Sequence, residues 1–154
     1  DVSVIWDWLP HPLYLAAKMF GAPPKALTAK SPDRQSPPFE VEAEVTYGDV
    51  SFDMRASWTA PEPVMRIAVT GDHGQLVFDD KSVSKVKLLL GDQSLHPEYP
   101  DTPPLLVELQ AFLGMVEGRI PNPSQLKDAA KVIQMLDDIE RSCELGGERI
   151  QISS

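Results

Sequence analysis

The chain has 154 residues, a formal net charge of −9 at pH 7, 42% hydrophobic residues and 24% charged residues. This length matches one ordinary domain, and a composition close to the globular average excludes a disordered, fibrous or disulfide-rich protein. The negative charge argues against nucleic acid as a partner, because it would repel a polyphosphate.

Cys143 is the sole cysteine, and a thiol that has no second cysteine to pair with fits a reducing compartment. We therefore expect a cytoplasmic protein and interpret Cys143 as a structural or incidental thiol. No apolar run approaches the ~20 residues that span a bilayer, so no membrane partner is expected. The chain opens on Asp1 and is already apolar at Val4, without a polar leader, which predicts a fragment of a longer protein.

The first predicted element is a helix near the N-terminus. Apolar residues recur at roughly helical spacing across 4–20. Pro10 and Pro12 suit the first turn of a helix, because the missing N–H has no partner there in any case. Gly21 suits the stop that follows the last helical residue, so we predict a helix over about 11–20.

A loop over 21–38, rich in Pro and Lys, precedes the first strongly alternating segments. Residues 39–47 and 50–59 each alternate between apolar and polar side chains, as half-buried strands do. Gly48–Asp49 between them suits a tight turn and predicts a hairpin. Within the loop, 26–29 could form a short extended piece. The segments with a strand pattern are 39–47, 50–59, 64–70, 75–78, 82–90 and 149–152.

The pattern changes to helical spacing in the last third of the chain. An apolar stripe over 105–116 follows Pro103–Pro104 and precedes Gly118, which predicts one helix. Ser124 suits the N-cap of a second helix, whose apolar stripe runs to Ile139. Because strands come first and helices follow, we predict an α+β fold: an open, mostly antiparallel β-sheet with helices packed on one face.

Asp7 and His11 are the strongest candidates for chemistry. If their segment is helical, a spacing of four puts the carboxylate and the imidazole on one side, where the acid can orient the ring for proton transfer. The alternative is that Asp7 caps the helix and His11 lies on its surface. Trp6, Trp8 and Trp58 either line a sugar-binding surface or fill a core or an interface. The other histidines lack a second His or Cys at metal-ligand spacing, so no metal site is expected.

Four segments in the same order and spacing resemble the Gfo/Idh/MocA family of oxidoreductases. The segment with Asp7 and His11 is similar to the family pattern G-G-x-x-x-D-x-G-x-H-x-x-D. The later ones are similar to G-x-x-G-x-L-x-F-D, P-L-x-x-E-L-x-A-F and D-A-x-x-V-x-x-x-L-x-x-x-x-x-S. In this chain the four segments are Val4–Leu13, Thr70–Asp79, Pro104–Leu113 and Ser124–Ser142.

The resemblance implies an NAD(P)-dependent dehydrogenase or reductase that transfers hydride at a hydroxyl or carbonyl of a sugar, cyclitol or related small molecule. Residues 1–154 would be its single C-terminal, substrate-binding and oligomerisation domain, similar to that of glyceraldehyde-3-phosphate dehydrogenase. The intact protein would bind NAD or NADP on an N-terminal Rossmann domain and form a homo-oligomer through the sheet face. Without that domain, this chain is expected to be inactive and to bind neither cofactor.

Carried over by position, the resemblance makes His11 the catalytic acid/base and Asp7 its partner or a substrate ligand. The chain departs from the pattern where Leu9 replaces a glycine before the histidine and Tyr14 replaces the second Asp, which implies a reshaped or partly closed site. Tyr14 either offers a hydroxyl to the substrate or simply packs, and Trp8 is a second candidate for substrate binding. The alternative function is a non-catalytic binding or self-association domain that retains the fold.

Overall fold

The computed structural model folds as two compact units. The residues that it describes are 2–33, 36–62, 64–122 and 125–152. Unit 1 combines Asp1–Ala60 with Asn122–Ser154, and unit 2 is Pro61–Pro121. Each unit has its own four-stranded sheet, and every strand pairing among the described residues is antiparallel. The predicted α+β class with a mostly antiparallel sheet is confirmed, although the strands divide between two sheets.

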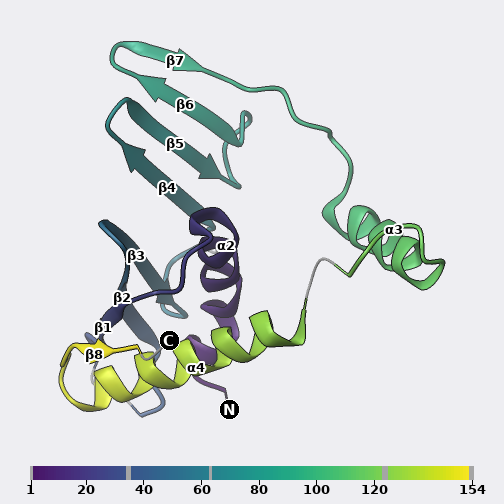
Figure 1. Ribbon diagram of the computed structural model, residues 1–154. Coiled ribbons are helices and arrows are strands. Elements are labelled where there is room, and N and C mark those ends of the chain that lie inside the picture. Colours follow the sequence, from purple (N-terminus) through teal and green to yellow (C-terminus); the bar gives the residue numbers. More distant parts are fainter. Residues whose placement is uncertain (1, 34–35, 63, 123–124, 153–154) are drawn as a thin grey trace. The chain divides into compact units, whose positions relative to one another are not determined.

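Unit 1 is built around a sheet with the strand order β3-β2-β1-β8 (Figure 1). The predicted hairpin is confirmed, because Tyr47 pairs with Val50 across a two-residue turn. Gly48 in this turn has a φ of 62°, which glycine adopts without steric cost. The predicted closing strand is β8, which pairs with β1. The strands are β1 (Ala26–Lys30), β2 (Glu40–Tyr47), β3 (Val50–Ser57) and β8 (Ile150–Gln151).

The helices of unit 1 are α1 (Val4–Trp8), α2 (Pro10–Phe20) and α4 (Leu126–Glu144). The helix predicted over 11–20 is α2, and it ends as expected at Gly21, whose φ is 64°. The sequence does not predict α1, a five-residue helix that leads into α2. The N-cap predicted at Ser124 lies outside the described residues.

The helices of unit 1 cover one face of its sheet. α4 packs against β1, while α1 packs against β2 and β3. The opposite face carries exposed charged side chains, among them Glu42, Glu44 and Asp53. The predicted one-sided packing is therefore confirmed in this unit. The largest fully buried side chains are Val4, Ile5, Leu9, Leu13, Leu27, Val41, Val45, Ile139 and Ser142.

Unit 2 has the strand order β4-β5-β6-β7. β6 begins later than predicted, because the backbone N–H of Ser82 donates to the carbonyl of Asp79 at 3.2 Å and closes a turn. The Gly91–Asp92 pair joins β6 to β7, a three-residue strand too short and polar to be predicted from the sequence. The strands are β4 (Arg66–Gly71), β5 (Gly74–Asp79), β6 (Val86–Leu90) and β7 (Gln93–Leu95).

The helix predicted after Pro103–Pro104 is α3 (Pro104–Val116), in unit 2. Most of its apolar side chains are exposed, so this helix adds little to the core of its unit. The exposed ones are Leu105, Leu106, Val107, Leu109, Phe112, Leu113 and Val116. Among the helices of the described ranges, none is long and apolar enough to cross a membrane.

Candidate functional site

Asp7 and His11 lie on consecutive helices of unit 1, in α1 and α2. Leu9 between them has φ −73° and ψ −20°, and its carbonyl accepts the N–H of Leu13 at 3.1 Å. The helical path therefore continues from one helix into the next. A spacing of four along such a path puts two side chains on the same side. Both side chains are exposed, so they are accessible to a small molecule.

The Asp7 carboxylate is bound by a side chain that is distant in the sequence and directly follows β3. Trp58 Nε1 donates a hydrogen bond to Asp7 Oδ2 at 3.3 Å, across 51 residues of sequence. Within the described residues, no hydrogen bond or ion pair joins Asp7 to His11. Asp7 does not cap α2 either, because the N-cap is Leu9 and no side chain caps that helix. The structure brings Asp7 to Trp58 and leaves His11 open to solvent.

The two predicted substrate-binding residues differ in their surroundings. Trp8 is exposed at the end of α1, whereas Tyr14 in α2 is half-buried and packs against the core. Lys18 lies over the Tyr14 ring, with Nζ 5.1 Å from the ring centroid, and forms an ion pair with Asp128 of α4 at 2.9 Å. The hydrogen bond between these two charges raises the pKa of Lys18 and lowers the pKa of Asp128.

The indole that reaches Asp7 is held by the ends of two paired strands. The backbone N–H of Trp58 donates to the carbonyl of Phe39 at 2.9 Å. The two aromatic rings also lie against each other, with centroids 5.9 Å apart and planes inclined by 40°. Trp58 follows β3 and Phe39 precedes β2, so the hairpin register determines where the indole lies.

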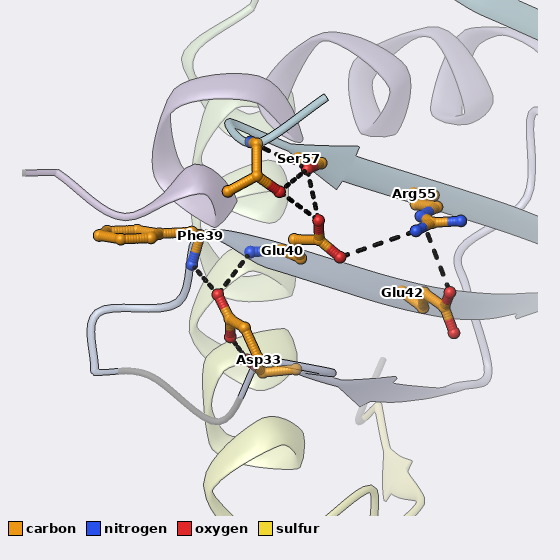
Figure 2. Close-up of polar contacts among 8 residues, drawn as sticks. Asp33, Phe39, Glu40, Glu42, Arg55 and Ser57 are labelled. Atoms are coloured by element: carbon orange, nitrogen blue, oxygen red, sulfur yellow. Dashed lines mark hydrogen bonds and ion pairs between the residues drawn. The ribbon is translucent and has the colours of Figure 1, made fainter. Parts of the chain in front are cut away.

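A cluster of polar side chains fixes these strand ends, as Figure 2 shows. Glu40 Oε1 accepts hydrogen bonds from Ser57 Oγ, at 2.9 Å, and from Thr59 Oγ1. Arg55 Nη2 lies 3.6 Å from Glu40 Oε2, and Arg55 Nε lies 3.8 Å from Glu42 Oε1. The hydrogen bonds from Thr59 and Ser57 hold the pKa of Glu40 below its usual range, so this carboxylate is ionised at neutral pH.

Asp33 anchors the segment that leads into β2. Its Oδ2 accepts the backbone N–H groups of Phe39, at 2.8 Å, and of Glu40, at 3.2 Å (Figure 2). Charge-assisted hydrogen bonds of this kind are stronger than neutral ones. The carboxylate therefore holds in place the backbone that carries the Phe39 ring.

The sequence predicts part of this arrangement. Apolar and polar residues alternate in both strands of the hairpin, and the turn lies at Gly48–Asp49. Together, these features predict the register that puts Phe39 opposite Trp58. No sequence signal connects Trp58 to Asp7, because that contact depends on how α1 packs on the sheet. Asp33 has no predicted role either, because its bonds to the backbone N–H groups of Phe39 and Glu40 leave no pattern in the sequence.

The described residues do not form a site for a dinucleotide cofactor. A dinucleotide site of the Rossmann type is built on a parallel β-α-β unit, with a glycine-rich turn that brings the phosphates to a helix N-terminus. Every strand pairing in the described part of this chain is antiparallel. The described residues therefore do not form a Rossmann-type site for a nicotinamide dinucleotide.

Solved structures share this fold over nearly the whole chain. UDP-N-acetylglucosamine 3-dehydrogenase GnnA from Acidithiobacillus ferrooxidans is 18% identical, with a TM-score of 0.82, over 94% of this chain and 48% of that one. WlbA dehydrogenase from Bordetella pertussis, solved with NADH and UDP-GlcNAcA, is 14% identical, with a TM-score of 0.76, over 100% of this chain and 47% of that one. An inositol dehydrogenase homolog from Azotobacter vinelandii, solved with NADH and myo-inositol, is 13% identical, with a TM-score of 0.71, over 97% of this chain and 50% of that one.

No protein-family model matches the sequence, and no curated protein matches it. At the identities of the solved structures, the likeness establishes the fold. The chain spans about half the length of the solved structures that it matches. These structures are Gfo/Idh/MocA-type dehydrogenases, and the resemblance expected from the four sequence segments is confirmed at the level of the fold. The chain therefore has the fold of the C-terminal domain of Gfo/Idh/MocA-type oxidoreductases.

Proposed function

We propose that this chain is the substrate-side half of a dehydrogenase or reductase that acts on a hydroxyl or carbonyl of a sugar, a cyclitol or a related small molecule. The observation that carries the proposal is the exposed Asp7 and His11 pair, on consecutive helices of a fold shared with sugar and cyclitol dehydrogenases. Residues 1–154 would serve together as one substrate-binding domain. NAD or NADP, bound to an N-terminal domain outside this chain, would supply or accept the hydride.

His11 would exchange a proton with the reacting hydroxyl or carbonyl oxygen. Histidine is the most frequent general acid or base in enzymes, and the exposed His11 ring has no partner among the described residues that would block a substrate oxygen. Asp7 would bind a second substrate hydroxyl or orient the ring. We assign Trp8 and Tyr14 to substrate binding, since both follow Asp7 along the same two helices.

The activity of the intact protein tests this proposal. We expect His11→Ala to lower kcat by about 10²-fold or more while the affinity for the cofactor stays unchanged. His73→Ala is the matched control, because His73 is an exposed histidine in a turn of unit 2, and its loss should leave kcat unchanged. An unchanged kcat in His11→Ala would overturn the proposed role of His11.

The exposed face of the unit 1 sheet is our proposed surface for homo-oligomer formation. Acidic Glu42, Glu44 and Asp53 lie there beside basic Lys30 and Arg55, so the face can complement a second copy of itself. Arg55→Glu should shift the intact protein toward the monomer in sedimentation velocity. An unchanged assembly would exclude this face as the interface.

We propose the cytoplasm as the compartment of the protein, because a lone cysteine fits a reducing environment.

A further inference from the structure

The indole of Trp58 is placed to control the carboxylate of Asp7. Its Nε1–H donates to Asp7 Oδ2 at 3.3 Å, and it is the side-chain partner that the structure gives Asp7 among the described residues. A carboxylate on a short, exposed helix can rotate about its side-chain bonds unless a donor selects one orientation. One oxygen of Asp7 faces the indole, which leaves the other for a ligand.

Several contacts hold the ring and the backbone of Trp58 and of its neighbours. Phe39 contacts its ring, and the backbone bond from Trp58 N–H to the Phe39 carbonyl measures 2.9 Å. Asp33 holds the Phe39 backbone from one side, while Glu40 binds the hydroxyls of the residues flanking Trp58. Figure 2 shows this cluster, which ties the ends of β2 and β3 to the loop before β2. The indole is therefore presented by a rigid strand end.

We propose that Trp58 is a positioning residue of the candidate site: its indole N–H orients the Asp7 carboxylate beside His11 for substrate. This inference rests on the proposed function, because Trp58 would affect catalysis only by orienting Asp7. Trp6 provides a contrast within the same unit, since its indole Nε1 also donates to a carboxylate, Glu140 Oε2 at 3.2 Å. Trp6 is half-buried, and its carboxylate partner lies on α4, which carries none of the candidate residues.

The contact itself can be tested in the 154-residue chain by NMR of the indole N–H groups. We expect Asp7→Asn to shift the Trp58 Nε1–H resonance and to leave the Trp6 resonance in place. Assignment comes from the Trp6→Phe and Trp58→Phe variants. An unmoved Trp58 resonance would overturn the inference, because the hydrogen bond would then be absent in solution.

The functional role requires a double-mutant cycle in the intact enzyme. Trp58→Phe keeps an aromatic ring against Phe39 but removes the N–H, and we expect kcat to fall roughly 3- to 10-fold with an unchanged KM for the cofactor. In an Asp7→Ala background, which removes the acceptor of the indole N–H, the same change should have no further effect on kcat. Trp6→Phe should leave kcat unchanged in either background.

The outcomes separate this inference from the proposed function. If Asp7→Ala lowers kcat and Trp58→Phe does not, the positioning role of Trp58 is wrong while the proposed function stands. The same holds if the two effects simply multiply, because Trp58 would then act independently of Asp7. If Asp7→Ala leaves kcat unchanged, the proposed role of Asp7 fails, and the role of Trp58 fails with it.

Discussion

Ser142 joins the helix and the sheet of unit 1 at a fully buried point. Its Oγ accepts the backbone N–H of Ala29 in β1, at 2.8 Å, and donates to the carbonyl of Glu148 beyond α4, at 2.6 Å. Removing the hydroxyl leaves the buried N–H of Ala29 without this partner, and an unsatisfied buried donor costs more than the bond itself contributes. The carbonyl of Glu148 loses its donor at a half-buried contact. Ser142 is also the last residue of the fourth family-like segment, and its two hydrogen bonds explain why a serine suits that position.

We therefore expect Ser142→Ala to lower the free energy of unfolding by about 1–3 kcal/mol. The measurement is urea denaturation followed by tryptophan fluorescence, since all three tryptophans lie in unit 1. Ser51→Ala is the control, because its hydroxyl bonds Glu44 on the exposed surface, and its effect should stay within about 0.5 kcal/mol. Equal effects of the two changes would contradict the account.

Cys143 should behave as a poorly reactive thiol. Burial raises its pKa to about 11, and the nearby carboxylates of Glu140 and Glu144 act in the same direction. Because the thiolate is the reactive form, about one molecule in 1,000 carries it at pH 8. Alkylation by iodoacetamide should therefore be slow at pH 8 in the folded chain and should accelerate about tenfold per pH unit up to the pKa. Rapid modification at neutral pH would contradict this prediction, because it would require a thiol that is more exposed, or has a lower pKa, than the structure indicates.

Some residue contacts follow from the sequence and others do not. The alternation of 39–47 and 50–59 fixes which side chains face the core, because the pairing register of a hairpin follows from its turn. The pairing of Asp7 with Trp58 joins residues that are 51 positions apart, and it depends on the packing of a helix on a sheet. The candidate pair Asp7 and His11 could be named from spacing and resemblance, but the partner of the carboxylate could not.

At the scale of elements, strong periodicity predicts more reliably than short or polar segments do. α2, the hairpin and α3 match their predictions, because each has a clear period and a stop signal. α1 and β7 are missed, since five and three residues are too few to show a period. The start of β6 is also misplaced, because the residues before it form a turn stabilised by backbone hydrogen bonds.

The turn between β4 and β5 makes a prediction about one glycine. A Cβ added at Gly74 would lie 2.2 Å from the backbone carbonyl oxygen of Leu89 in β6, and a backbone atom in a paired strand cannot move aside cheaply. Gly74→Ala should therefore disrupt the pairing of β5 with β6 and destabilise unit 2 by about 1–3 kcal/mol. Hydrogen exchange of the β5 and β6 amides measures this effect.

Gly71, at the other side of the same turn, is the matched control. An added Cβ there meets nothing within 4 Å, so Gly71→Ala should leave the exchange rates of the two strands close to those of the unchanged chain. If the β5 and β6 amides exchange as slowly in the Gly74→Ala variant as in the Gly71→Ala variant, the close approach of Leu89 to Gly74 does not exist in solution.

At the scale of the whole molecule, the described residues have the fold of the C-terminal domain of Gfo/Idh/MocA-type oxidoreductases and form no Rossmann-type dinucleotide site. The solved structures that share the fold are about twice as long as the matched part, and two of them were solved with NADH. The 154-residue chain should therefore show no binding of NADH or NADPH in a fluorescence titration. Measurable affinity for either would contradict this prediction.

We propose that these residues belong to a nicotinamide-dependent oxidoreductase. The most direct test is a calorimetric titration of the full-length protein, including any domain that precedes Asp1, with NADH and with NADPH. The account predicts saturable binding of at least one of them, with an affinity unchanged by His11→Ala. Binding of neither cofactor would contradict it and would favour a non-catalytic binding or self-association domain that has kept the fold.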